Sequence, residues 1–438
     1  MLNNRGLEER VGLKTMKKYI FILFCALVIL IPSGSAFALE TLDILQKDAC
    51  ENRDLVKRYQ ADLDILMARE VKTRGAFYPS LDLGYTLNKL NHDTAAGEDS
   101  ENDTFTGTIS WNLFAGFKDY YTLKSVQNLT RAGQFKLDLI RQDIRLNVAM
   151  DFLGIYRSME NLKVAEAAVK LYDDRLRQID LKVKVGVLKK TDFLKVKVEM
   201  DNALQTRRRV EAAVAAGINR LAFEIGRSVD AGELDFAIFN HLPEKGSVTE
   251  CQKRLLSSRS DLNALRMAFA AAEMNVSASR ASLYPRADLS LGYSSHTRDG
   301  FFPENFENSD DEVRCQAVIS MNLFDGMQKY AVTRQARLEQ QKIRFDIREL
   351  EETLKTELEN VLLDMDVAFD NLIVAKAGTV EAKENLRITD LAFGQGIGTS
   401  TDVLDAIFGI SRARFNLVTA YTEVFETHFR LRRLLEDF

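Results

Sequence analysis

Residues 109–116 read ISWNLFAG, and residues 319–326 repeat the pattern as ISMNLFDG. In both copies, apolar residues at alternate positions lead into Asn-Leu-Phe and a glycine, which is typical of a β-strand that ends in a turn. A long stretch with helical periodicity follows each copy. We therefore predict that the chain consists of two copies of one structural unit.

The flanking sequence repeats in the same order. Tyr78–Leu83 (YPSLDL) matches Tyr284–Leu289 (YPRADL), and segment 176–194 matches 386–404 around a glycine and a Thr-Asp pair. Several matches in constant order indicate a duplicated unit rather than one chance octapeptide. The predicted divisions are a first repeat at 39–225, a linker at 226–247 and a second repeat at 248–438.

Segment 1–38 has the layout of a cleavable signal peptide. Lysines precede an apolar run from Tyr19 to Ile31, and Ala36-Phe37-Ala38 ends the segment. An apolar run of 13 residues is too short to cross a bilayer as a helix. We therefore expect an exported protein, with an uncleaved membrane anchor as the alternative.

The composition favours an extended helical protein, because the 438 residues include only five prolines and 28% are charged. The net charge of -5 gives no reason to expect a nucleic-acid partner. The four histidines are scattered without metal-ligand spacing, and the sequence has no nucleophile elbow and no phosphate loop. We expect no enzymatic activity, no cofactor and no metal site.

Each repeat is predicted to run helix, strand, strand, long helix, tight turn and returning helix. The opening helices are expected at Leu42–Ala76 and Val248–Leu283, each ended by a Tyr-Pro pair. Alternating apolar residues then predict strands at about 81–90 and 105–114, and at about 287–296 and 313–324. Apolar seams predict long helices at 118–185 and 327–393, each on the order of 100 Å in length.

The strands limit how the protein could enter a membrane. Each is about 10 residues long, the length of a tilted transmembrane strand, and acidic loops at 91–103 and 297–312 join them in pairs. Four strands are too few to close a transmembrane barrel, and lipid does not tolerate an open sheet edge. Two chains would pool eight strands and three would pool twelve. The alternative is a pair of surface hairpins on a soluble protein.

The chain resembles the TolC family of outer-membrane efflux and secretion ducts, over about residues 42–435. The resemblance is carried by Pro79 with its strand, by WNLFAG and MNLFDG, by RSDLNAL at 259–265 and by GIGTSTDVLDA at 396–406. It implies a mostly α-helical homotrimer with a small membrane β part. Three chains would form a 12-stranded β-barrel in the outer-membrane lipid and a long α-helical barrel across the periplasm.

The resemblance also implies a function. The protein would be the exit duct of a tripartite efflux pump or a type I secretion system, and would conduct small molecules or polypeptides passively. Its partners would be a periplasmic adaptor and, indirectly, an inner-membrane pump of the RND or ABC type. The alternative is a periplasmic coiled-coil scaffold or adaptor outside any membrane, which does not account for two matched hairpins.

Within this resemblance, the two glycine-bearing turns form the periplasmic mouth. The candidate adaptor-docking residues are Gly186, Val187 and Leu188 in the first turn, and Gly396, Ile397 and Gly398 in the second. The alternative is that these residues only end the helices.

Asp180 and Asp390 occupy matching positions shortly before those glycines. In a trimer they would place six carboxylates near a closed mouth, where charge repulsion and cation binding could control opening. Arg177 and Arg387 lie three residues earlier and complete the candidate gate. The alternative is a surface pair of each arginine with its aspartate at i,i+3.

Six lysines gather at the first turn and have no counterpart at the second: Lys182, Lys184, Lys189, Lys190, Lys195 and Lys197. An acidic adaptor surface is one hypothesis, and a solvated helix face, which the sequence alone favours, is the other. Arg207–Arg209 is likewise interpreted as solvated.

Overall fold

The computed structural model describes residues 40–89, 91–92, 101–244, 248–297 and 310–438. The predicted signal peptide and most of both acidic loops lie outside these residues. Within them, no helix combines the length and the apolar character needed to cross a membrane.

The same order of elements occurs in both halves of the chain. The first half contains α2 (Leu42–Asn52), α3 (Asp54–Arg74), β1 (Ser80–Lys89), β2 (Glu101–Ala115), α4 (Lys118–Lys184) and α5 (Lys190–Ile225). The second contains α6 (Val248–Ser258), α7 (Ser260–Ser279), β3 (Arg286–Thr297), β4 (Asp310–Ser320), α8 (Gln328–Gly394) and α9 (Ser400–Leu434). The prediction of a mostly helical protein with a small sheet is confirmed.

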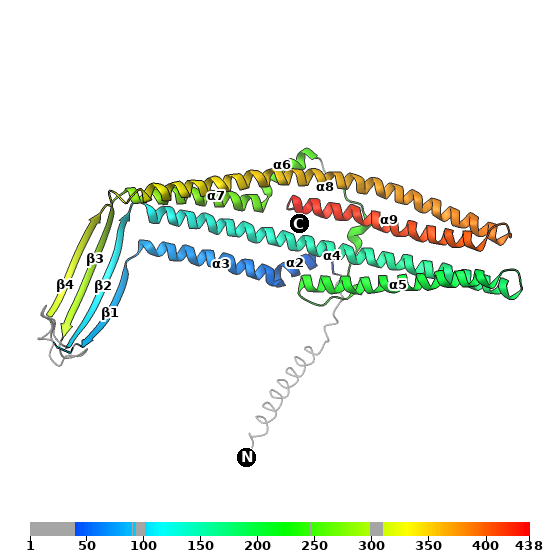
Figure 1. Ribbon diagram of the computed structural model, residues 1–438, viewed down its shortest axis with the longest axis horizontal. Coiled ribbons are helices and arrows are strands. Elements are labelled where there is room, and N and C mark those ends of the chain that lie inside the picture. Colours follow the sequence, from blue (N-terminus) through cyan, green and yellow to red (C-terminus); the bar gives the residue numbers. More distant parts are fainter. Residues whose placement is uncertain (1–39, 90, 93–100, 245–247, 298–309) are drawn as a thin grey trace, which may run out of the picture.

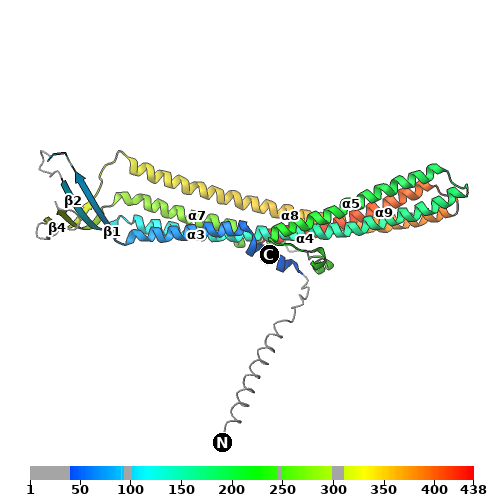
Figure 2. The ribbon, with the colours of Figure 1, turned by 90° about the horizontal axis from the view of Figure 1, so that it is seen from below.

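The molecule is elongated, with the sheet at one end and the helices running away from it (Figure 1). The helices α4 and α8 have 67 residues each, so each is about 100 Å long. The helix α3 packs along the part of α4 near the sheet, and α5 packs along the part far from it. The helices α7 and α9 pack along α8 in the same way. The α4–α5 and α8–α9 hairpins end close together, far from the sheet (Figure 2).

The prediction of one uninterrupted opening helix in each repeat is wrong. Arg53 separates α2 from α3, and Arg259 separates α6 from α7, each with an extended backbone (ψ 124° and 118°). The Arg53 guanidinium donates to Phe223 O at 3.0 Å, and that of Arg259 donates to the carbonyls of Arg433 and Leu434 at 3.4 Å. The Phe223 and Leu434 carbonyls lie in the last turns of α5 and α9, where carbonyls lack donors within the helix, so each break places an arginine as a cap on a returning helix.

The strands form one antiparallel sheet in the order β1-β2-β3-β4. The strand β2 begins at Glu101, before the predicted position 105, and Asp103 accepts a hydrogen bond from the Tyr85 hydroxyl at 2.8 Å. The strand β4 ends at Ser320, before the predicted position 324. Ser320 pairs with Arg286, the first residue of β3, so within the described residues β3 has no further residue to pair with Met321–Phe324.

The sheet joins each long helix through two consecutive left-handed residues. These are Gly116 and Phe117 (φ 63° and 66°) before α4, and Gly326 and Met327 (φ 68° and 72°) before α8. A Cβ on Gly116 would lie 2.4 Å from the carbonyl oxygen of Ala281, which lies in the short 3-10 helix after α7 (Arg280–Leu283), so this close approach requires glycine. The repeated octapeptide therefore encodes a sharp turn in both copies.

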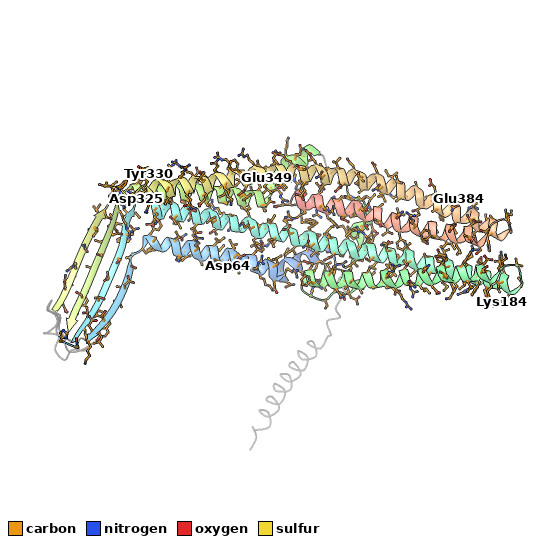
Figure 3. All side chains as sticks on the ribbon, viewed as in Figure 1. Asp64, Lys184, Asp325, Tyr330, Glu349 and Glu384 are labelled. Carbon is orange, nitrogen blue, oxygen red and sulfur yellow. The ribbon has the colours of Figure 1, made fainter. Side chains whose placement is uncertain are left out.

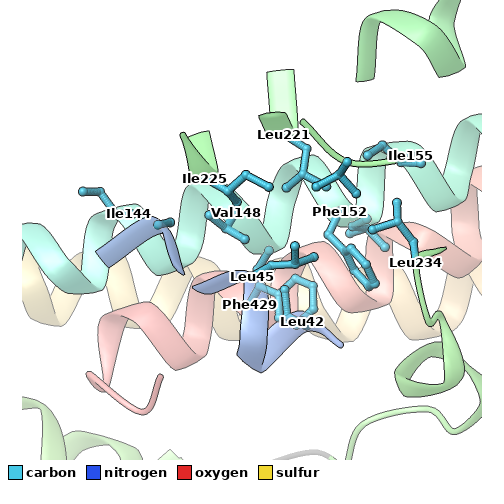
Figure 4. Packing of buried hydrophobic residues seen from close by; sticks show 14 of the residues in the cluster. Leu42, Leu45, Ile144, Val148, Phe152, Ile155, Leu221, Ile225, Leu234 and Phe429 are labelled. Atoms are coloured by element: carbon cyan, nitrogen blue, oxygen red, sulfur yellow. The ribbon is translucent and has the colours of Figure 1, made fainter. Parts of the chain in front are cut away.

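The largest core lies midway along the molecule, where α2, α4, α9, the end of α5 and the linker meet (Figure 4). Ile144, Val148, Phe152 and Ile155, which recur at helical spacing in the segment predicted as the first long helix, are at most 1% exposed, which confirms an apolar seam on this part of α4. Phe239 of the linker is also buried there, so residues 226–244 pack against the helices.

Candidate functional site

The two helical hairpins end in matching turns. Gly186 and Gly396 have φ of 79° and 80°. The Val187 N–H donates to Lys182 O at 2.8 Å, and the Ile397 N–H donates to Ala392 O at 2.9 Å. These are the bonds of a Schellman motif, so both glycines end a long helix by taking the left-handed conformation.

The turns expose four of the six candidate docking residues. Gly186 and Gly396 are exposed, as are Val187 (68%) and Ile397 (80%). Leu188 is half-buried against the hydrophobic cluster next to the turns, which includes Ile179 and Val403. Gly398 is also half-buried, and a Cβ on it would lie 3.1 Å from Phe393 N. A docking surface at the turns would therefore centre on the exposed apolar side chains of Val187 and Ile397.

The returning helices begin differently. Thr399 caps α9: its hydroxyl accepts from the Asp402 N–H at 3.2 Å, and Asp402 accepts from the Thr399 N–H at 2.8 Å. Hydrogen bonding to the Thr399 side chain, and then to its backbone N–H, lowers the pKa of the Asp402 carboxyl. Lys189 holds the matching position before α5, where its N–H donates to Asp192 at 3.3 Å. Since a lysine side chain accepts no hydrogen bond, only α9 has a complete capping box.

The carboxylates of the candidate gate do not form the i,i+3 pairs considered as the alternative. Asp180 pairs with Lys184 at 2.6 Å, and Arg177 pairs with Asp173 at 2.6 Å. Arg387 pairs with Glu384 at 2.7 Å, which lowers the pKa of Glu384. Figure 3 places Lys184 at the end of the first hairpin and Glu384 on α8 near the second. Both arginines thus bind carboxylates of their own helix, away from the candidate aspartates.

Asp390 instead reaches across to the first repeat, where it pairs with Arg175 of α4. The Arg175 side chain is only 6% exposed, and it also donates to Gln178 at 2.9 Å. Its guanidinium lies 5.0 Å from the ring centre of Phe393. This buried cation therefore joins α4 to α8 just above both turns.

Sequence reasoning missed Arg175, although a signal was available. Arg175 stands three residues after Tyr172 and four before Ile179, and both of these neighbours are buried. This spacing places a charged residue on the apolar seam of the helix. A charge in such a position needs a partner, because burying it alone is costly.

A groove of about 660 Å³ opens between α5 and α9 directly above the turns. Leu194, Val198 and Phe408 line it and are each more than half exposed. At its base, burial raises the pKa of Tyr172 to about 12, with further contributions from Glu199 and Asp405. This tyrosine therefore stays neutral at ordinary pH.

The sheet at the other end has one apolar and one polar face. Leu81, Ile109, Leu291 and Cys315 are cross-strand partners in sequence, so their side chains share one face. The adjacent row runs through Asp82, Thr108, Gly292 and Arg314 on the opposite face. The apolar members of this face are Leu81, Leu83, Tyr85, Leu87, Phe105, Ile109, Trp111, Ala287, Leu289, Leu291, Tyr293, Val313, Cys315, Ala317 and Ile319, and the polar residues Asp103, Ser295, Thr297 and Asp311 lie on the same face at the end next to the loops. All four residues from β1 in this set are exposed.

The sequence matches the family described as outer membrane efflux protein over residues 45–227 and 252–436. It is 22% identical over 424 residues to Outer membrane protein TolC of Vibrio cholerae, with 92% of each chain covered. It is 23% identical over 448 residues to Alkaline protease secretion protein AprF of Pseudomonas aeruginosa, covering 94% of this chain and 88% of that one.

The fold is also similar to that of solved channels. The outer membrane protein VceC of Vibrio cholerae superposes with a TM-score of 0.78 at 17% identity, covering 90% of this chain and 95% of that chain. Since the family match spans most of the chain in two consecutive parts, the resemblance stated from sequence is confirmed. The chain belongs to the outer membrane efflux protein family and is an outer-membrane exit duct for efflux or secretion, with its helices in the periplasm.

Proposed function

We propose that three copies of this chain form one pore, in which their sheets close a 12-stranded barrel in the outer membrane and their helices form a periplasmic tunnel. The two-faced sheet is the observation that carries this proposal. An exposed apolar face suits lipid, and a polar face suits a water-filled lumen. Within the described residues, β1 and β4 each pair on one side only, so both edges need a neighbour.

The helical end would form the mouth that receives cargo from a periplasmic adaptor and an inner-membrane pump. The exposed Val185, Val187 and Ile397 support docking at the turns, since a group of exposed apolar side chains at a hairpin end suits a protein contact. The duct would conduct passively, without catalysis. The divisions at 1–38, 39–225, 226–247 and 248–438 remain part of this proposal, and the two consecutive family matches at 45–227 and 252–436 support the division into two repeats.

The gate in this proposal consists of Asp180, Asp390 and Arg175. The Arg175–Asp390 pair would hold α8 against α4 in the closed mouth, and the exposed parts of both aspartates would attract cations. Arg177 and Arg387, which pair within their own helices, would lie outside the gate. Removing one partner of a buried ion pair strongly destabilises the arrangement that buries it. Breaking this pair should therefore favour the open mouth over the closed one.

The test is conductance in planar bilayers with the purified full chain. Wild-type protein should run as a trimer in detergent and form pores; a monomer that washes off membranes would contradict the trimeric pore. R175Q and D390N should raise the mean conductance, and D180N with D390N should weaken block by divalent cations.

R177Q is the matched control, because it removes an arginine from the same helix turn without touching Asp390. It should conduct like wild type. Unchanged conductance in R175Q, or an equal increase in R177Q, would reject the gate while leaving the pore intact.

A further inference from the structure

The two turns differ sharply in charge. Residues 182–197 contain six lysines and one aspartate, whereas the matching residues 392–407 contain two aspartates and no lysine or arginine. The turns lie side by side, since Lys195 donates to Thr401 at 3.4 Å and the Lys182 ammonium lies 4.1 Å from the ring centre of Phe393. A basic surface therefore borders a neutral to acidic one.

Four of the six lysines have contacts within the molecule. Lys182 and Lys195 contact the second hairpin, while Lys184 pairs with Asp180 and Lys197 pairs with Asp201 at 3.0 Å. The side chains of Lys189 and Lys190 are exposed, and they have no hydrogen bond or ion pair within the part of the chain that the structure describes. These two ammonium groups are therefore available to another molecule.

Their position disfavours a purely structural role. Lys189 and Lys190 stand at the N-terminal end of α5, where the helix dipole favours anions and repels cations. The second copy shows the stabilising solution at the same place, with Thr399 as a hydrogen-bonding cap followed by Ser400. The first copy thus gives up local stability at a solvent-exposed turn, as proteins commonly do at functional sites.

We propose that the first turn, residues 182–197, is a docking surface for an acidic protein partner that Lys189 and Lys190 recognise. This inference rests on the proposed function, which places both turns at the mouth of a periplasmic duct, and it specifies the chemistry of the partner. The second turn, which has no lysine or arginine, docks through Ile397. The two turns therefore contribute different kinds of contact to one partner assembly.

The surroundings of the lysines favour a protein over a lipid surface or a small anion. Val185 (74% exposed) and Val187 (68%) stand next to the lysines, and Leu194 and Phe408 line the groove just above. An acidic patch with apolar residues beside it would satisfy the ammonium groups and cover these side chains together. Such a combination is a property of protein surfaces.

The test grafts the second copy's residues into the first. K189T/K190S removes both cations and supplies a capping hydroxyl, so its heat-unfolding midpoint should equal or exceed that of wild type. The probe is a synthetic antiparallel helical hairpin with glutamates at its loop end, and a hairpin with glutamines in their place is its control. Binding to the full-length channel in detergent is measured by fluorescence anisotropy at low and high salt.

The glutamate hairpin should bind wild type more tightly than the glutamine hairpin does. K189T/K190S should weaken that binding about tenfold, as expected for the loss of two surface ion pairs, and should reduce its salt dependence. R208S/R209S, which removes two cations from the same helix away from the turn, should bind like wild type.

Equal binding by wild type and K189T/K190S overturns the inference, and so does an equal loss in R208S/R209S. Lysine-dependent binding to phosphatidylglycerol vesicles without binding to the glutamate hairpin also overturns it in favour of lipid. Pore formation in planar bilayers distinguishes a failure of this inference from a failure of the proposed function. If only the inference is wrong, wild type and K189T/K190S both still form pores. If the proposed function is wrong, wild type itself forms no pores.

Discussion

The buried guanidinium of Arg175 connects α4 to α8 near the two turns. It contacts Asp390, Gln178 and the Phe393 ring, yet its Nε has no hydrogen-bond partner within the described residues. A cation held this way stabilises the contact between α4 and α8 only while the carboxylate stays in place. The contact therefore depends on one residue from each repeat.

The partners of the gate residues could not be predicted from sequence. Asp390 lies 215 positions from Arg175, and their contact depends on the relative placement of two long helices. Sequence spacing gave Asp390 a local candidate, Arg387, but Glu384 binds that arginine on the same helix. Local spacing identified the charged groups correctly and assigned their partners wrongly.

His428 gives a prediction about pH. Burial lowers its pKa and Arg432 lowers it further, while Asp437 opposes the shift. An unfolded histidine has a pKa of about 6.5. Because the folded protein holds the neutral form, the stability from this group is present above pH of about 6.5 and is lost as pH falls below it. H428Q should therefore lose less stability between pH of about 7.5 and pH of about 5 than wild type.

Heat unfolding followed by circular dichroism at several pH values checks this difference. Burial raises the pKa of the Asp151 and Glu224 carboxyls, so these two groups change the stability with pH in the opposite direction to His428. Wild type and H428Q both contain them. Only the difference between wild type and H428Q is therefore informative. Parallel pH profiles would show that the imidazole contributes nothing.

At the scale of elements, the arginine breaks tie each opening segment to the end of its returning helix. The Arg259 side chain is 8% exposed and that of Arg53 is 20% exposed. R259A would leave the Leu434 carbonyl without its donor and would remove the ion-pair partner of Asp261, at a cost of about 2–3 kcal/mol. R53A should cost about 1–2 kcal/mol, since water can reach its partners.

Denaturant unfolding of both variants measures these costs. R58A on the exposed surface of α3 is the control and should change stability by less than about 0.5 kcal/mol. Equal effects from all three substitutions would reject the capping role.

The elements differ in how far sequence could define them. The seam of α4 and the alternation of β1 and β3 were predictable because their apolar residues recur with the period of a helix or a strand, and such a pattern lies within the segment itself. The breaks at Arg53 and Arg259 were not, because neither proline nor glycine marks them and the carbonyls that fix them belong to distant helices. The early end of β4 likewise depends on where β3 begins.

At the scale of the whole molecule, Cys315 offers a direct test of how chains meet. It is exposed on β4, at one edge of the sheet, and belongs to the apolar face. In a closed barrel, β4 of one chain would pair with β1 of the next, so apolar-face residues of β1 would approach Cys315.

Cysteines introduced singly at Leu81, Leu83, Tyr85 and Leu87 should include one that forms a disulfide between chains on oxidation. Cysteines at Asp82 and Thr86, on the opposite face, should not. The background replaces Cys50 and Cys251 by alanine, and non-reducing gels give the result. Cross-links from the polar-face positions alone, or from none, would contradict the proposed strand pairing.

The unlike charges of the two turns also restrict symmetry. A ring built from three chains would alternate lysine-rich and lysine-free turns, so neighbouring positions around its rim would be equivalent only at every second step. Six identical subunits placed on that rim would fall into two sets of three with unequal affinity. A binding titration would then saturate in two stages. The affinity of the first stage would depend on salt concentration, and that of the second would be almost independent of it.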